Sequence, residues 1–286
     1  MGAKQGDLTV TALYTSQTWA WGGLSYAALF ATPEGKRVFD ATNAALAAAS
    51  LFKRGLAPLR VSLLHRHTMI DHLLRESGYR HVLELAAGLS RRGAAFSEDE
   101  RMRYTEIDLP HVVAKKRELL ARSDEGRAVL TRPGLRFAGG DLENLDLEQF
   151  ALRGAPLFVI AEGLMMYLAA EARQRLFARV RRLAEVSGEL RFVFDLVPRS
   201  EEPAPGAVGR LLEAAMKTFT GGRTFERDAH TREQILRELR AAGFEEATPI
   251  SSNDVAAAWG LPHAGEKTKM VLFACATRAS LPATPS

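Results

Sequence analysis

From residue 80 onward, short apolar segments alternate with helical segments, and this alternation constrains the fold more than any other feature of the sequence. Two of the intervening segments, 111–122 and 170–187, are predicted to be helices. Short apolar strands separated by helices are typical of an α/β fold, in which helices cover both faces of a parallel sheet. The predicted strands of this sheet cover residues 81–86, 102–107, 135–138, 157–161 and 190–196.

The N-terminal part of the chain shows no such alternation and is predicted to consist of helices and loops. Apolar residues from Trp19 to Leu29 are spaced like one face of a helix, and further helices are predicted over 38–51 and 59–76. We therefore expect an N-terminal helical cap, residues 1–79, followed by a domain over residues 80–286.

The C-terminal part resumes the alternation after an interruption. A helix over 231–242, closed by Gly243, precedes strands near 246–250 and 269–277. The interruption, residues 197–225, is rich in proline and glycine and follows a sheet strand. Long insertions at that edge of a sheet commonly form active-site lids, so we expect a lid there.

Composition limits the class of protein. The 286 residues carry a net charge of +4 with a pI near 9.3, which is too mildly basic to require a nucleic-acid partner. A single cysteine, Cys275, excludes an intramolecular disulfide and a cysteine-rich zinc site, and fits a reducing location. The uncharged stretch 8–33 is broken by threonine, serine and glutamine, so no membrane span is predicted there. We expect a cytoplasmic protein.

A turn of small residues follows the first predicted strand. The sequence Ala86-Ala87-Gly88 lets the backbone approach a ligand closely, because Gly88 can adopt conformations barred to other residues. The dinucleotide fingerprint GxGxxG and the phosphate loop GxxxxGK[ST] are both absent. A nicotinamide-dependent oxidoreductase is therefore disfavoured.

Acidic residues stand at the ends of four successive predicted strands: Asp108, Asp141, Glu162 and Asp195. Parallel strands end at the same edge of a sheet, where such folds bind their ligands. A carboxylate at the position of Asp108 suits a ribose diol, and Asp141-Leu142 suits an adenine edge. Carboxylates without a phosphate loop favour a cationic nucleoside, and S-adenosylmethionine fits that description.

Four blocks of sequence carry a resemblance to a known family. In order they are Arg66-His67-Thr68-Met69-Ile70-Asp71, the turn ending Ala87-Gly88-Leu89, Tyr104-Thr105-Glu106-Ile107-Asp108-Leu109-Pro110, and Ala161-Glu162-Gly163-Leu164-Met165-Met166-Tyr167-Leu168. With these blocks the chain resembles the leucine carboxyl methyltransferase family, a branch of the class I S-adenosylmethionine-dependent methyltransferases that includes bacterial enzymes of polyketide biosynthesis. The resemblance implies a Rossmann-like sheet whose last strand is antiparallel.

The resemblance also implies roles for individual residues. Arg66 would pair with the carboxylate of S-adenosylmethionine, Gly88 would pass close to its methionine chain, and Glu162 would face its amino end. Asp108 would hold the ribose hydroxyls, and Asp141 with Leu142 would contact adenine. Tyr167, Trp19 and Tyr14 are the candidates for the acceptor pocket. One departure is that Ser90 and Arg91 stand where family members commonly carry an acidic residue and threonine.

The expected reaction is methyl transfer to a carboxylate or hydroxyl oxygen of a small, polyketide-like metabolite. A carboxylate needs no base, whereas a hydroxyl needs one, and no histidine is assigned that role. A catalytically silent cofactor-binding protein and a nucleic-acid methyltransferase remain alternatives, although Pro-Pro-Tyr motifs are missing. The arginines between 173 and 182 are interpreted as a solvated helix face. No metal site is predicted, and the oligomeric state stays open.

Overall fold

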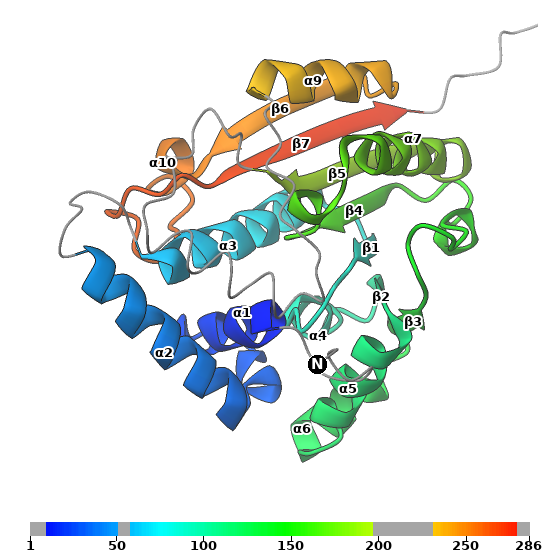
Figure 1. The fold of residues 1–286 in the computed structure, drawn as a ribbon. Helices are drawn as coiled ribbons and strands as arrows, with labels where there is room; N and C mark the ends of the chain where they lie inside the picture. The colour runs from blue at the N-terminus through cyan, green and yellow to red at the C-terminus, as the bar shows by residue number, and fades with distance from the viewer. Residues whose placement is uncertain (1–9, 51–57, 197–230, 279–286) are drawn as a thin grey trace, which may run out of the picture.

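A seven-stranded sheet forms the centre of the molecule (Figure 1). The computed structural model describes residues 10–50, 58–196 and 231–278. The strand order is β3-β2-β1-β4-β5-β7-β6, with β7 antiparallel to both neighbours and the pairs from β3 to β5 parallel. The strands are β1 (His81–Leu85), β2 (Arg103–Asp108), β3 (Leu135–Gly139), β4 (Leu157–Ala161), β5 (Glu189–Asp195), β6 (Glu246–Ser251) and β7 (Val271–Arg278). The predicted sheet, including its antiparallel last strand, is confirmed.

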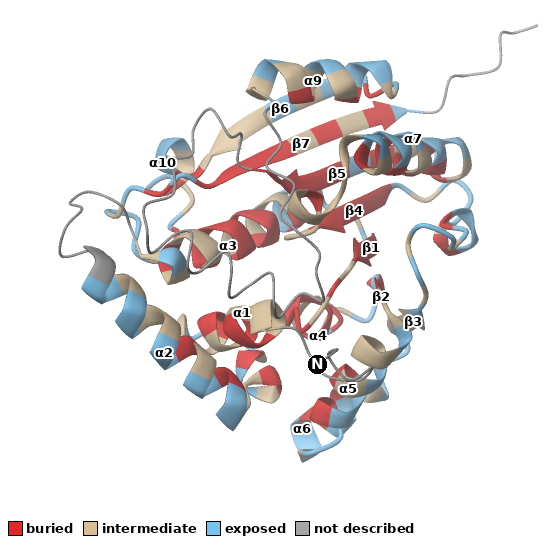
Figure 2. Ribbon diagram, viewed as in Figure 1, coloured by how far each residue is buried: buried red, intermediate tan, exposed pale blue. Residues whose placement is uncertain are grey.

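Helices cover both faces of this sheet because alternate residues of each central strand point to opposite sides. In β4, Leu157, Val159 and Ala161 join a core with α7 (Ala170–Ser187) and α9 (Arg232–Ala241). On the other face, Phe158 and Ile160 pack with α3 (Leu59–Ser77) and α10 (Ser252–Val255). Burial on both faces explains why β4 is apolar throughout, and Figure 2 shows the buried strands between helices with exposed outer faces.

The remaining helices lie at the N-terminal part of the chain and around β2 and β3. Two helices, α1 (Val10–Trp21) and α2 (Pro33–Ser50), pack on each other, and Trp19 of α1 packs with Leu64 of α3. The other elements are α4 (Arg92–Phe96), α5 (Pro110–Leu120) and α6 (Asp124–Leu130), with short 3-10 turns η1 (Ala27–Phe30), η2 (Glu148–Phe150) and η3 (Met165–Tyr167).

The predicted helix through Trp19–Leu29 is wrong in its extent. The helix α1 ends at Trp21, since Gly23 adopts a φ of 66° and the chain turns before η1. The second predicted helix begins earlier than expected, because Pro33 occupies the first helical turn, where its missing N–H costs nothing. The helix α3 lies in the predicted cap segment, yet its Met69 and Ile70 pack on the sheet.

The C-terminal predictions hold where the structure describes them. Thr231 caps α9 through a reciprocal pair of hydrogen bonds with Gln234, and Gly243 ends the segment with a φ of 93°. The predicted lid, residues 197–225, lies outside the described residues.

Candidate functional site

A pocket of about 840 Å³ opens at the carboxyl ends of β1, β2 and β3, beside the start of α7. Four of the predicted site residues line it, namely Asp108, Asp141, Leu142 and Tyr167. Such edges of parallel sheets are where α/β folds bind ligands. Arg66, Gly88 and Glu162 are not among the residues that line it, so the predicted site extends beyond this pocket.

The turn after β1 is shaped by two left-handed residues. Ala86, which lines the pocket, has a φ of 52°, and Gly88 has a φ of 51°. A side chain added at Gly88 would meet no atom within 4 Å, so space is open above the turn. Glycine adopts this conformation freely, whereas alanine is strained in it. The turn therefore exposes backbone to a ligand at the cost of strain at Ala86.

Asp108 joins this turn to the end of β2. The amide of Gly88 donates to Asp108 Oδ2 at 2.7 Å, and the amide of Leu109 donates to Oδ1 at 2.7 Å. Burial raises the pKa of Asp108, although both amide bonds oppose the shift. Each oxygen keeps a lone pair for a second donor, so this fixed carboxylate can still accept both hydroxyls of a diol.

Asp141 starts an exposed loop after β3. Its carboxylate accepts hydrogen bonds from the Glu143 amide at 3.0 Å and from Asn144 Nδ2 at 3.3 Å. Arg179 of α7 fixes the same loop, because its guanidinium donates to the carbonyls of Leu142 and Leu145. These contacts hold the loop against the pocket, where Leu142 lies next to Asp141.

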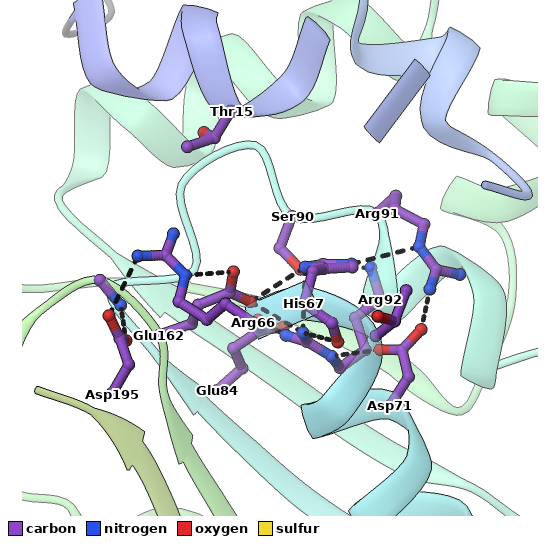
Figure 3. Close-up of polar contacts among 12 residues, drawn as sticks. Thr15, Arg66, His67, Asp71, Glu84, Ser90, Arg91, Arg92, Glu162 and Asp195 are labelled. Carbon is purple, nitrogen blue, oxygen red and sulfur yellow. Dashed lines mark hydrogen bonds and ion pairs between the residues drawn. The ribbon is translucent and has the colours of Figure 1, made fainter. Parts of the chain in front are cut away.

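A second, buried group of side chains lies beside the glycine turn (Figure 3). We call it the arginine–carboxylate cluster. Its members come from α3, β1, the start of α4 and the ends of β4 and β5, and each is no more than 8% exposed at its side chain. They are Arg66, His67, Asp71, Glu84, Arg91, Arg92, Glu162 and Asp195.

Arg66 connects two strand ends within this cluster. Its Nε donates to Glu162 Oε1 at 2.9 Å, and its Nη1 donates to Asp195 Oδ2 at 3.0 Å. The Gly163 amide donates to the other oxygen of Asp195 at 2.5 Å. A side chain at Gly163, whose φ is 68°, would lie 3.3 Å from the Arg66 guanidinium, so glycine permits their close approach.

Arg92 connects three carboxylates from the opposite side. It donates to Asp71 at 2.7 Å, to Glu84 at 2.5 Å and to Glu162 Oε2 at 2.7 Å. Tyr104 of β2 donates to the remaining oxygen of Glu84 at 2.7 Å. The Arg92 side chain is fully buried. Its positive charge compensates the three buried carboxylates, which would be costly inside the protein without a partner.

The four predicted strand-end carboxylates therefore fall into two kinds. Burial would raise the pKa of Glu162, but the hydrogen bond from His67 and the charges of Arg66 and Arg92 hold it well below its usual range. Asp195 is likewise paired with Arg66. Asp108 and Asp141 form no ion pair in the described part of the chain and depend on backbone or amide donors instead.

The three acceptor-pocket candidates lie in different surroundings. The hydroxyl of Tyr167 donates to Thr11 Oγ1 of α1 at 3.4 Å, at the border of the pocket. Trp19 stacks on His67 with 4.1 Å between ring centroids. Tyr14 donates to Asn43 of α2 at 3.1 Å, and burial raises its pKa to about 12. The structure thus brings Tyr167 to the pocket and Trp19 to the cluster, while Tyr14 packs between helices.

Several residues of the site were not predicted. The sequence places Glu84 in the predicted strand 81–86 and Asp71 in the predicted helix 59–76, but it indicates no partner for either. A charge inside an apolar segment was the available signal, because buried charges require partners. The interpretation of the 173–182 arginines as a solvated face is wrong for two of them. Arg173 is buried against Glu238, and Arg179 holds the Leu142 loop.

No group of three or more histidine, cysteine, aspartate or glutamate side chains in residues 10–50, 58–196 and 231–278 could hold a metal ion. Within those same ranges, no helix has both the length and the apolar character needed to cross a membrane.

Comparison with known proteins identifies the family. The model of the leucine carboxyl methyltransferase family matches residues 25–181. A Mycobacterium avium (strain 104) protein, provisionally named as an S-adenosyl-L-methionine-dependent methyltransferase, is 30% identical over 73% of this chain and 68% of its own length. A Parafrankia sp. (strain EAN1pec) protein of the same provisional name is 31% identical over 42% of this chain, and this chain spans 39% of its length.

Among solved structures, a provisionally assigned methyltransferase from Thermobifida fusca YX shares the fold. The TM-score is 0.58 at 15% identity, over 96% of this chain and 97% of that one. Together with the strand order, this likeness confirms the predicted class I methyltransferase fold. Since the family model covers more than half of the chain, the protein belongs to the leucine carboxyl methyltransferase family.

Proposed function

We propose that the protein is an S-adenosylmethionine-dependent methyltransferase that methylates an oxygen of a small, polyketide-like metabolite. One observation carries this proposal. In a member of this family, a carboxylate at the end of β2 is held by two backbone amides at the rim of an 840 Å³ pocket. The name of the Mycobacterium avium relative points to the same cofactor.

The residues present fit this cofactor in charge and in space. Asp108 would accept the ribose hydroxyls, and Asp141 with Leu142 would contact adenine at the other end of the pocket. The open space above Gly88 leaves room for the methionine chain. In the cluster, Glu162 and Asp195 both pair with Arg66, and carboxylates at this position would attract a cationic ligand.

The methionine end of the cofactor would lie against the cluster. Arg66 would pair with its carboxylate, and Glu162 would accept from its ammonium group. Both side chains are already fixed by neighbours, Arg66 by Asp195 and Glu162 by Arg92, so little reorganisation accompanies binding.

The cofactor supplies an activated methyl group, and the protein must align it with the acceptor. Orientation of this kind can contribute about 7–11 kcal/mol to lowering the barrier. Tyr167 and Trp19, with the segment over 197–225, would border the acceptor and exclude water, and Tyr14 would support them from between α1 and α2. A carboxylate acceptor is ionised near neutral pH and attacks without a base.

Calorimetry followed by a turnover assay tests this proposal. We expect S-adenosylhomocysteine to bind and NAD not to bind. Tritiated S-adenosylmethionine should then label small carboxylic acids or phenols, and alkali should release the label as methanol from an ester but not from an ether. Binding without turnover on any metabolite extract would support a silent cofactor-binding protein, and NAD binding alone would exclude the proposal.

A further inference from the structure

Arg91 occupies an unusual position beside the glycine turn. Its side chain is 3% exposed and donates to Asp71 Oδ2, to His67 Nε2 at 3.2 Å and to Ser25 Oγ at 3.3 Å. Ser25 lies between α1 and η1, whereas Asp71 and His67 belong to α3. One guanidinium therefore connects the N-terminal segment to the residues that surround Glu162.

The contacts of His67 favour one arrangement of its protons. Guanidinium nitrogens always donate, so the Nε2 that faces Arg91 Nε carries a lone pair. A neutral imidazole then carries its proton on Nδ1, which donates to Glu162 Oε2 at 2.9 Å. Arg92 Nη2 also lies 3.0 Å from Nδ1, so both ring nitrogens face a guanidinium. Among the described residues, only Nδ1 also faces an acceptor, Glu162 Oε2, so a ring proton on Nδ1 has a partner and one on Nε2 does not.

We propose that Arg91 is a positioning residue that fixes His67 as the neutral Nδ1–H tautomer and, through it, orients Glu162 toward the amino end of the cofactor. The first part concerns the free protein alone. The last part rests on the proposed function.

The surroundings of His67 support this assignment on every side. Arg91 and Arg92 face it from the start of α4, Glu162 faces it from the end of β4, and Trp19 of α1 covers its ring at 4.1 Å. Burial and the charge of Arg92 hold the pKa of His67 well below its usual range. An imidazolium would place an Nε2–H against the Arg91 Nε–H, so Arg91 excludes the charged form by geometry.

Removal of Arg91 would free Nε2, while Nδ1 would keep its contact with Glu162. Nε2 would lose its obligatory donor, and the carboxylate of Glu162 would favour a proton on the ring. The imidazolium would then compete with the cofactor for the charge of Glu162. Arg91 thus keeps the charge of Glu162 available to the cofactor. Because Arg91 also donates to Ser25, the orientation of Glu162 depends on how the segment between α1 and η1 packs against α3.

Nuclear magnetic resonance of the wild-type protein tests the first part directly. Long-range proton–nitrogen spectra of histidine-labelled protein report the tautomer of each of the seven histidines, and a His67→Gln variant assigns the signal. We expect the neutral Nδ1–H form of His67 at pH 7, with no titration down to pH 5.5. An Nε2–H tautomer, or an imidazolium at pH 6, would overturn the proposal without any variant of Arg91.

Two variants and a matched control test the link to Glu162. In Arg91→Met we expect the pKa of His67 to rise and S-adenosylhomocysteine to bind about tenfold more weakly below the titration of His67. Arg91→Lys should show a similar shift while retaining charge near Asp71, because an ammonium lacks the planar fork. Arg75→Met removes an exposed partner of Asp71, at 3.6 Å, and should change neither readout.

The outcomes separate this inference from the proposed function. If the wild type does not bind S-adenosylhomocysteine, the proposed function fails, while the tautomer of His67 still decides the role of Arg91. If the Arg91 variants shift the tautomer but bind with wild-type affinity at every pH, the link to Glu162 is wrong. Unchanged spectra in folded Arg91→Met protein contradict the whole inference.

Discussion

The two halves of the site hold their carboxylates in different ways. In the pocket, Asp108 is held by the amides of Gly88 and Leu109, and Asp141 by that of Glu143. In the cluster, Glu162 is held by side chains from α3 and α4, with Arg66, His67 and Arg92 all within 2.9 Å. Backbone amides carry no net charge, so Asp108 and Asp141 keep their full negative charge. The arginines that pair with Glu162 instead neutralise most of its negative charge.

This difference assigns different tasks to the two halves. An acid held by amides can recognise a neutral diol through hydrogen bonds alone, and little else in the molecule depends on it. A cluster of buried charges forms a rigid wall, but each member depends on the others, so loss of one leaves uncompensated charge. We therefore expect cluster substitutions to affect stability and pocket substitutions to affect binding.

The largest effect should come from Arg92→Met in the cluster. This change leaves Asp71, Glu84 and Glu162 without their shared guanidinium, and loss of one partner of a buried pair typically costs about 3–5 kcal/mol. Urea unfolding at pH 7.5 measures the loss. Arg101→Met, which removes an arginine with a 73% exposed side chain, should change stability by less than about 0.5 kcal/mol. Equal stability of the two variants would show that the cluster is not cooperative.

A buried ion pair between α5 and β2 should give a pH-dependent loss of stability. Lys116 of α5 contacts Glu106 of β2, and no further hydrogen bond reaches either charged group in the described part of the chain. Burial raises the pKa of Glu106 to about 7, with Lys116 opposing the shift. The folded protein thus holds this proton more tightly than the unfolded chain, so the contribution of Glu106 to stability falls as the pH rises from about 4.5 to 7.

Lys116→Met should therefore destabilise the protein more at high pH than at low pH. At pH 8 Glu106 loses the cation that stabilises its charge and must bind a proton or stay charged without a partner, at a cost of about 3 kcal/mol, whereas at pH 5.5 it already binds a proton and most of the loss disappears. Urea unfolding at both pH values provides the measurement, with Lys115→Met as the surface control, since Lys115 pairs with an exposed glutamate. A loss independent of pH would mean that the lysine only fills space.

The sequence predicted the pocket better than the cluster, and the physical reason is local. Asp108 ends the buried strand β2, and Gly88 lies in the small-residue turn after β1. Because these two strands are parallel neighbours, the order of elements along the chain places both residues at one edge of the sheet. Arg92 and Asp71 instead meet through the packing of α3 against the start of α4. No periodicity encodes which buried charges face one another across elements.

The N-terminal segment shows the same limit. The alternation of strands and helices along the chain predicted the sheet. The sequence assigned Trp19 only to a helix face, because its stacking on His67 depends on how α1 packs against α3. The predicted roles of Arg66, Gly88, Asp108, Asp141, Leu142 and Glu162 toward a cofactor remain predictions. Binding measurements on single variants address them directly.

Asp108→Ala should change binding far more than stability. The ribose hydroxyls would lose a charged acceptor, and hydrogen bonds to charged groups are worth about 1.5–3 kcal/mol each, so S-adenosylhomocysteine should bind at least about 100-fold more weakly. Calorimetry measures the affinity. Asp124→Ala, a fully exposed acid of α6, serves as the control and should bind normally. Wild-type affinity of Asp108→Ala would remove this carboxylate from the site.

The smallest effect should have the opposite sign. Ala86 adopts a φ of 52° at the end of β1, a conformation that costs alanine about 1–2 kcal/mol. Glycine would remove this strain, but its greater backbone entropy in the unfolded chain would cost about 0.5–1 kcal/mol. Ala86→Gly should therefore raise the free energy of unfolding by about 0.5 kcal/mol. The matched variant Ala87→Gly, at a residue without a positive φ, should lower it by a similar amount. Because Ala86 borders the pocket and lies outside the cluster, this gain should persist in the Arg92→Met background. A gain that vanishes there would show that the glycine turn and the cluster act as one unit.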